Sequence, residues 1–463
     1  MQSQRRSSWI MAAYAAPSLP LAALGLPLVV YLPNHYSATL GLSVSAVGAA
    51  FLLVRLIDII FDPIFGTILD RTRWSTGRFR PWLSIGAPMI MLATWMLFMA
   101  EGGVGLGYLW LWLCVLYGGY SICTLAHSAW GSTLSTDYNE RSRIYAWWQS
   151  GNVVGMILVL MLPVALAAIP QATIRGVPAM GWFIVLLVPL AVGAALMVVP
   201  EPRATTSGLE HKVGVSAYFD LIRRPTIAKI LFADLLLHIG PGVAGALFFF
   251  YFEHVKGYSK TEAETLLLIY FISAIVGAPL WAIVAKKLGK HRALMTAAII
   301  YALVQFAIPF VPATSLLVAL PFLIAAGLPY SSAGVLLRAM LADAGDEERL
   351  RTGQDRTGTL YAILTGTIKI GMALAVGSFI VLGWMGFNAA DPAASAPLAM
   401  RGLEWMYAAL PGGFALLAAW VLARYPLTEA RHAEIRQQLA EIDREAPQAT
   451  VTPTAHVVQS PAE

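Results

Sequence analysis

Long apolar runs, separated by short polar turns, follow one another along nearly the whole chain. Each run covers about 20 residues or more, the length that an α-helix needs to cross the hydrocarbon core of a bilayer. We count twelve runs, centred near Leu21, Leu53, Met91, Leu116, Met156, Leu187, Ala244, Ile272, Ile300, Phe322, Ile370 and Leu416. Short alternating segments, typical of membrane barrels, do not occur between them. The pattern predicts an all-α membrane protein with twelve transmembrane helices.

The basic residues orient these helices. If the N-terminus is cytoplasmic, the outer loops contain only Arg175, Lys256, Lys260 and Arg401, although the chain has 31 Lys and Arg residues in all. Basic residues concentrate on the cytoplasmic side of membrane proteins. We therefore predict that both termini are cytoplasmic.

A polar stretch divides the runs into two sets of six. We predict an N-terminal six-helix bundle at 1–199, a cytoplasmic central loop at 200–224, a C-terminal six-helix bundle at 225–425 and a cytoplasmic tail at 426–463. The segments GTILDRTRWSTGR and WAIVAKKLGKHR each join a small-residue helix end to a basic turn. Such parallel repeats around a central site are a known transporter plan. In the tail, 429–444 has the pattern of an amphipathic helix, and the composition after it predicts disorder.

Composition supports a membrane protein. The chain is 58% hydrophobic and 12% charged, and its mean hydropathy is +0.68. Soluble domains carry about 25% charged residues, so a soluble enzyme and a disordered chain are excluded. The net charge of +5 comes from scattered loop residues, which argues against a nucleic-acid partner. Cys114 and Cys123 lie in one apolar run, so a disulfide framework is not expected.

Three charged residues lie inside the second run, VRLIDIIFDPIFG. Arg55, Asp58 and Asp62 are spaced i, i+3 and i+7, which places them on one helical face. A charge at the bilayer centre costs at least about 2.5–3.5 kcal/mol, so this face is expected to line a protein interior or a water-filled path. The cluster could be a salt bridge that only locks helix packing. However, two acids and one base leave a negative charge that a cation, a proton or another base must neutralise.

The eleventh run supplies such a base. Lys369 is the one charged residue in YAILTGTIKIGMALAVG, with Thr365 one turn before it and Tyr361 two turns before it on the same side. The lysine lies about two turns inside the run, where its side chain cannot easily reach the headgroups. Pairing with the acids of the second run is the natural solution.

The seventh run carries Asp234 and His238, four residues apart, just before Gly240, Pro241 and Gly242. Proline and glycine are common in spanning helices where cavities form. Two interpretations remain open: the pair lines a substrate pocket, or the two side chains bond only to each other.

Further polar and aromatic residues are candidates for substrate binding. They are His127 and Trp130 in the fourth run, and Trp148 and Gln149 at the start of the fifth. Aromatic rings beside amide and carboxylate groups suit a ligand with apolar C–H faces and hydroxyls, such as a sugar. A packing role for His127 and an interfacial role for the tryptophans are the alternatives. No phosphate loop, zinc-ligand spacing or catalytic triad can be identified, so we do not expect an enzyme.

The segment DIIFDPIFGTILDRTRWSTGRFRPWL, from Asp58 to Leu83, resembles the glycoside–pentoside–hexuronide:cation symporters of the major facilitator superfamily. Further similar segments follow in order, including STLSTDYNERSR and LADAGDEERLRTGQDRTG. The resemblance implies the major facilitator fold of two six-helix bundles.

The resemblance also implies roles for particular residues. Arg55, Asp58 and Asp62 match the family's cation-site cluster, which makes Na⁺ a possible ligand of the two aspartates, and Lys369 matches its helix 11 lysine. Thr365 and Trp130 match positions that contact sugar. The conformational latch of the superfamily is matched by Gly66, Asp70, Arg71 and Arg73.

The sequence departs from the family at several positions. The family's aspartate in the first helix has no counterpart in PSLPLAALGLP, and its helix 4 aspartate falls at Ala126. Two neutral sodium ligands fall at Phe61 and near Cys123, and an arginine is replaced within 148–151. Sodium prefers several hard oxygen ligands, whereas two close carboxylates can share a proton. We therefore expect H⁺ rather than Na⁺ as the coupling ion.

These observations predict a secondary active transporter. We expect cation-coupled symport of a sugar, glycoside or similar small polar solute by alternating access, in a multi-pass protein of bacterial inner-membrane type. We expect a monomer in the lipid bilayer, with no cofactor beyond the coupling ion. The alternatives are a transporter of an amphipathic, lysolipid-type substrate, and a non-transporting sensor or assembly protein with the same fold.

Overall fold

The structure is a computed structural model that describes residues 7–72, 74, 77–134, 138–169, 174, 176–201, 215–312, 315–354 and 356–445. Within these residues, twelve helices or continuous helical runs are long and apolar enough to cross a membrane. Each contains one of the twelve centres predicted from the sequence. The all-α, twelve-helix fold is therefore confirmed.

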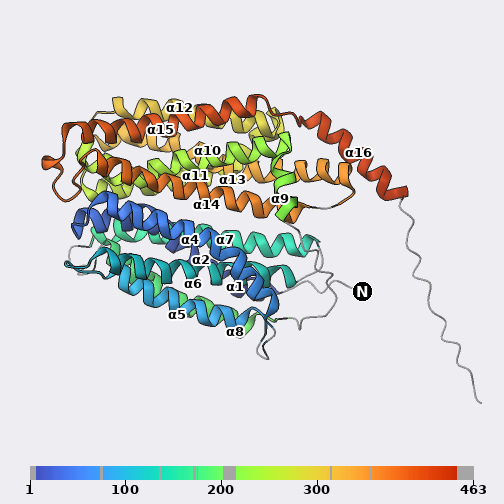
Figure 1. Ribbon diagram of the computed structural model, residues 1–463, viewed down its shortest axis with the longest axis horizontal. Coiled ribbons are helices and arrows are strands. Elements are labelled where there is room, and N and C mark those ends of the chain that lie inside the picture. Colours follow the sequence, from blue (N-terminus) through green and yellow to red (C-terminus); the bar gives the residue numbers. More distant parts are fainter. Residues whose placement is uncertain are drawn as a thin grey trace, which may run out of the picture.

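The N-terminal half begins with one long helical span. It comprises α1 (Ser8–Ala15), α2 (Ser18–Leu26), η1 (Pro27–Tyr31), α3 (Leu32–Asn34) and η2 (His35–Thr39). The helices that follow in this half are α4 (Val44–Arg71), α5 (Arg80–Phe98), α6 (Leu106–Thr133), α7 (Tyr138–Ala167) and α8 (Val177–Val198). They form the lower group in Figure 1, coloured blue to green.

The C-terminal half forms the upper group in Figure 1. Its elements are α10 (Pro225–Phe249), η3 (Phe250–Val255), α11 (Lys260–Leu288), α12 (Lys290–Ala307), η4 (Ile308–Phe310), α13 (Leu316–Thr352), α14 (Thr357–Trp384), η5 (Pro392–Ala394) and α15 (Pro397–Ala423). Between the halves, α9 (Val215–Ile222) lies within the predicted central loop and runs across the ends of the other helices (Figure 1).

The helices expose apolar side chains to the outside of the molecule. On α4, Leu53, Ile60 and Ile64 are 52%, 64% and 50% exposed. Asp58, between them in the sequence, is only 6% exposed. In water such apolar exposure would be unfavourable, but in a bilayer it is the lipid-facing side. The amphipathicity of α4 therefore runs opposite to that of a soluble helix, because its polar face points inward.

The first span of each half contains wide, π-helical turns at its outer end. The backbone N–H of Leu32 bonds to the carbonyl of Pro27, and the N–H of Leu40 bonds to that of His35. In the C-terminal half, Lys256 N–H bonds to the Tyr251 carbonyl. Each bond spans five residues instead of four, so one extra residue fits into the turn. The two halves thus share this feature at equivalent places.

Close contacts between the bundles lie toward the outer face. A Cβ atom built on Gly48 of α4 would lie 2.6 Å from Phe379 Cβ of α14, and one on Gly383 would lie 2.6 Å from Ser45 Cβ. The rings of Tyr31 and Phe249 also meet across the two halves. Glycine allows the two backbones to approach this closely. At this end of the molecule the two bundles are therefore in direct contact.

The helix predicted in the cytoplasmic tail is present as α16 (Glu429–Glu445). Its residues Ile435 and Leu439 are buried as part of the C-terminal core. His432 Nε2 lies 2.9 Å from Asp346 Oδ2 at the inner end of α13. The rest of the tail, for which disorder is expected, lies outside the described residues.

Candidate substrate and cation site

A cavity of about 550 Å³ lies between the two bundles. Its lining comes from α2, η1, α4, α6 and α7 on the N-terminal side and from α10 to α15 on the C-terminal side. Ligand pockets in proteins are about 300–1,000 Å³, so the cavity can hold a small organic molecule. Its place at the interface of the two halves is where transporters of this plan bind substrate.

A three-membered charge cluster joins the bundles beside the cavity. Lys369 Nζ of α14 lies 2.8 Å from Asp58 Oδ2 and 2.5 Å from Asp62 Oδ2, both on α4. Asp58 is buried, and Asp58 and Lys369 line the cavity. The lysine expected to pair with the acids of the second span is thus placed against both of them. A change in the charge of either acid would alter a contact that holds the two halves together.

Two neighbours complete the N-terminal side of this cluster. Ser121 of α6 donates a hydrogen bond of 2.5 Å to Asp58 Oδ1, the carboxylate oxygen that Lys369 does not contact. Arg55, also a lining residue, has its Cζ 5.7 Å from the centre of the Tyr117 ring. Both oxygens of Asp58 are therefore held by donors from different helices, which fixes the carboxylate in one orientation.

A second titratable pair lies in the C-terminal wall. His238 Nδ1 of α10 lies 2.8 Å from the Asp234 carbonyl oxygen and 3.2 Å from Asp234 Oδ1. Thr367 of α14 donates to Asp234 Oδ2 at 2.9 Å. Because Nδ1 faces two acceptors, it carries a proton, and the second ring nitrogen, Nε2, is left for other contacts. His238 lines the cavity and Asp234 is buried behind it.

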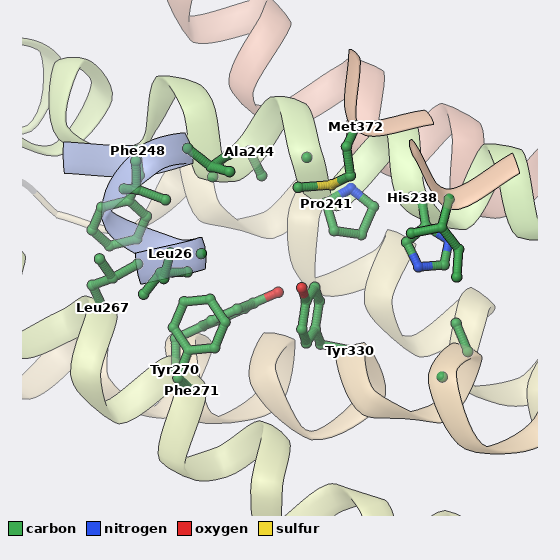
Figure 2. A pocket seen from close by; sticks show the side chains of 18 of the residues that line it. Leu26, His238, Pro241, Ala244, Phe248, Leu267, Tyr270, Phe271, Tyr330 and Met372 are labelled. Atoms are coloured by element: carbon green, nitrogen blue, oxygen red, sulfur yellow. The ribbon is translucent and has the colours of Figure 1, made fainter. Parts of the chain in front are cut away.

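Neutral polar side chains gather on the same C-terminal wall. Figure 2 shows the hydroxyls of Tyr270 and Tyr330 pointing toward one another in the middle of the cavity; their ring centres are 5.5 Å apart. Ser331, next to Tyr330, also lines the cavity. Among the described residues its Oγ has no hydrogen-bond partner, although it is buried. A buried hydroxyl of this kind is available to a ligand.

Other residues proposed from the sequence lie away from this cavity. Trp130 is fully buried and donates to the Pro200 carbonyl at 3.2 Å. His127 packs on Tyr14, with its Nε2 2.6 Å from the Tyr14 carbonyl oxygen. The His127 contact ties α6 to α1, which corresponds to the packing alternative for this residue, and the Trp130 contact ties α6 to the residue after α8 and its C-cap.

Four further candidates also do not line it. The Trp148 carbonyl accepts a hydrogen bond of 3.0 Å from Ser18, and the side chain of Gln149 is exposed. On α14, Thr365 donates to the Tyr361 carbonyl at 3.0 Å, and the Tyr361 hydroxyl donates to the Arg338 carbonyl at 3.0 Å. None of the four is among the lining residues in the described part of the chain.

The proposed latch is described only in part. Gly66 lies in α4, and a Cβ atom built on it would meet nothing within 4 Å. The side chains of Asp70 and Arg71, and the whole of Arg73, lie outside the described residues. In the described residues just before α5, Glu201 Oε1 accepts a hydrogen bond of 2.8 Å from the Phe79 backbone N–H and a second one from the Arg78 backbone N–H.

Five polar residues of the site were not predicted from the sequence: Ser121, Thr367, Tyr270, Tyr330 and Ser331. Each is neutral and lies in an apolar run, so none has the insertion cost that made the charged residues conspicuous. A hydroxyl in such a run gives no signal of its own, and only the rotation of each helix shows which hydroxyls face inward. No group of three or more His, Cys, Asp and Glu residues within the described ranges could hold a metal ion.

Comparison with known proteins identifies the family. A family model described as MFS/sugar transport protein matches residues 13–429. The uncharacterized symporter YnaJ of Bacillus subtilis (strain 168) is 26% identical over 431 residues, which is 89% of this chain and 90% of that protein. The glucuronide carrier protein homolog of Escherichia coli (strain K12) is 24% identical, over 89% of this chain and 90% of that protein.

The raffinose carrier protein of Pediococcus pentosaceus is 24% identical over 87% of this chain, which spans 65% of the carrier's length. Among solved structures, the nucleoside transporter NupG superposes with a TM-score of 0.64 at 14% identity, covering 90% of this chain and 99% of that one. This likeness shows the fold alone. The resemblance found in the sequence is confirmed. The chain belongs to the MFS/sugar transport protein family, and it is a multi-pass membrane transporter of bacterial inner-membrane type rather than an enzyme.

Proposed function

We propose that the protein is a cation-coupled symporter that carries a carbohydrate through the membrane, with H⁺ as the coupling ion. The observation that carries the proposal is the bridge of Lys369 to Asp58 and Asp62, which connects the two bundles at the edge of the cavity. A charge cluster at this place links ion binding to the relative position of the halves.

The coupling follows from the energetics of this bridge. Without an added cation, Lys369 neutralises the two carboxylates only in part, and it holds α14 against α4. A proton on one carboxylate weakens the bridge, because a neutral acid attracts the lysine less strongly. The state in which the bridge is closed and the state in which it is open thus bind the ion with different affinities. This difference is the condition for coupling.

Several features favour a proton over sodium. Sodium needs several oxygen ligands. One oxygen of Asp58 already accepts from Ser121, and the other contacts Lys369. Phe61 and Cys123 offer no hard oxygen from their side chains. A proton needs only one carboxylate oxygen, so it fits this set of side chains better.

The relatives support a carbohydrate substrate. Two of them are named a raffinose carrier and a glucuronide carrier homolog. The cavity combines aromatic rings with hydroxyl and imidazole groups, which suit the C–H faces and hydroxyls of a sugar ring.

The test is uptake into proteoliposomes, driven by a proton gradient or by a sodium gradient, with a panel of radiolabelled sugars and glycosides. Asp58→Asn and Asp62→Asn should each abolish accumulation driven by the proton gradient and leave downhill exchange measurable. Asp343→Asn is the matched control, because Asp343 pairs with Lys290 at 2.6 Å outside the cavity. Unchanged accumulation in both aspartate variants would refute the coupling role, and accumulation driven only by sodium would refute the choice of ion.

A further inference from the structure

A second cavity, of about 350 Å³, lies at the outer end of the molecule. The N-terminal bundle lines it with His35 and Thr39 of η2, the end of α7 and the start of α8. The C-terminal bundle lines it with Lys260, Thr261 and Glu264 from the first turns of α11. The cavity therefore lies between the two bundles, and its walls separate when the bundles move apart at this end.

Glu264 is the acid of this cavity. Only 4% of the residue is exposed, and its carboxylate has no hydrogen bond or ion pair with any described residue. Lys260, one turn earlier on α11, extends toward the other bundle, where its Nζ would lie 3.7 Å from a Cβ atom built on Gly176. An ionised carboxylate that is buried without a partner is costly, and the uncharged acid avoids most of this cost.

The groups around Glu264 do not supply a partner for a negative charge. Tyr31 of η1 and Glu253 of η3 lie near enough for their charges to interact with it, and the Tyr31 hydroxyl and Glu253 Oε1 are themselves buried without a hydrogen bond in the described structure. His35 Nε2, on the opposite wall, is also buried and unpaired there. Along α13, which packs on α11, residues 316–337 carry no charge. The lining residues of α7 and α8 are apolar or glycine: Pro163, Ala167, Gly176, Val177 and Pro178. A second acid nearby makes an ionised Glu264 still less stable.

We infer that Glu264 is a second proton-binding residue, which holds a proton while the two bundles meet over it at the outer end. When the bundles separate there, water reaches the carboxylate and it ionises. Closing of this end thus takes up one proton, and opening releases it. The inference rests on the proposed function only in that the bundles alternate between two forms, because Asp58 and Asp62 are not part of this site.

The direction of the pH dependence distinguishes Glu264 from His35. An acid that is neutral in the closed form favours closing at low pH, and this effect is lost as the pH rises. An imidazole that is neutral in the closed form favours closing at high pH instead. One proton changes the ratio of the open to the closed form by at most about tenfold per pH unit.

Spin-label distances across the outer end test the inference on the purified, full-length protein in nanodiscs, without substrate or ion gradient. The labels are placed at the exposed positions Gly102 and Ala390, and the populations at short and long distance are compared from acidic to alkaline pH. In the unmodified protein the population at long distance should grow as the pH rises. Glu264→Gln keeps the shape of the side chain but cannot ionise. It should reduce the slope of this change by up to about tenfold per pH unit and keep the short distance at alkaline pH.

Glu262→Gln is the matched control. Glu262 lies two residues from Glu264 on α11 but does not line the cavity, and a glutamine can replace it in the capping box with Ser259. This variant should behave as the unmodified protein. Infrared difference spectra give a second readout, because the C=O stretch of a neutral carboxyl should disappear at neutral pH in Glu264→Gln and not in Glu262→Gln. A purely structural role of Glu264 would not produce this signal.

The double variant Asp58→Asn/Asp62→Asn separates this inference from the proposed function. The pH dependence of the label distance should persist in it. If the dependence is lost there and unchanged in Glu264→Gln, the inference is wrong and proton coupling by the central acids stands. A closed population that grows as the pH rises, or one that follows the Na⁺ concentration instead of the pH, would also overturn the inference. Sugar accumulation that needs no proton gradient, together with a pH response that Glu264→Gln removes, would refute the proposed coupling ion alone.

Discussion

The rings of Tyr31 and Phe249 meet edge to face across the two bundles, with their centres 4.8 Å apart. Both side chains are almost completely buried. Tyr31 ends the first wide turn of the N-terminal span, and Phe249 immediately precedes that of the C-terminal span. The pair thus closes the outer side between equivalent elements of the two halves.

Removing one ring should loosen this closure. Phe249→Ala is expected to favour the outward-open form, because the aromatic pair contributes about 0.5–1.5 kcal/mol beyond its buried area. Spin labels at Gly102 and Ala390, both in exposed outer loops, should show an added population at longer distance. Trp182→Ala is the control, since Trp182 meets Trp95 edge to face at 4.7 Å within one bundle. An equal change in both variants would contradict a specific role of the pair.

A methyl group at Gly48 should have a larger effect. Its Cβ would lie 2.6 Å from Phe379 Cβ and 3.2 Å from the backbone nitrogen of Ile380, so α4 and α14 would have to separate. We expect Gly48→Ala to reduce uptake at least tenfold and to lengthen the same label distance. Gly377→Ala, on α14 but with nothing within 4 Å of the added atom, should behave as the unmodified protein. Normal uptake by Gly48→Ala would show that the close crossing is not required.

Loss of Lys369 should destabilise the protein through its two acids. In Lys369→Gln, Asp58 and Asp62 face each other without their base, at a cost of about 3 kcal/mol at most, because water in the cavity screens part of the repulsion. Adding Asp62→Asn should recover most of the lost thermal stability but not accumulation of substrate. Lys290→Gln removes the ion pair with Asp343, in which the lysine is more exposed than Lys369. This substitution should lower the free energy of unfolding by less than about 1 kcal/mol. Thermal unfolding is measured for the unmodified protein and the three variants. A double variant that is less stable than Lys369→Gln would contradict this account.

The tail helix should contribute to stability and not to substrate binding. Ile435 is 1% exposed where α16 packs on the C-terminal core. Ile435→Asp would bury a charge and should release α16, lowering the unfolding midpoint by several degrees. Gln438→Asp places the same charge on the exposed side of α16 and should have little effect. A change in ligand affinity in Ile435→Asp would instead indicate that the tail acts on the cavity.

The fold and the charge cluster could be predicted from the sequence because both follow from the length, spacing and charge of residues along the chain. A run of about 20 apolar residues is long enough to span a bilayer wherever it packs. Arg55, Asp58 and Asp62 share a face through their spacing alone. Their excess of negative charge calls for a base, and Lys369 is the one charge in its span. Charge balance therefore predicts contacts between side chains that lie 311 and 307 positions apart in the sequence.

The neutral part of the site could not be predicted in this way. A tyrosine or serine in an apolar run can either pack against another helix or bind a ligand. A rotation of the helix by one residue changes which of these two roles the side chain has. Thr365 illustrates the point, since it lies one turn from Lys369 and yet donates to its own helix. The length of α13 could not be predicted either. The residues after Ala342 are mostly polar, which is typical of a loop, but the helix continues to Thr352.

The wide turns at Pro27–Tyr31 and Phe250–Val255 separate each of the two spans into segments of different phase. One inserted residue rotates everything beyond it by about 100° around the helix axis. The rotational position of the side chains beyond such a turn is therefore independent of that of the side chains before it. A shortening by one residue within Phe250–Val255 would rotate the residues beyond this turn and leave the cavity-lining residues of α10, which precede it, in register.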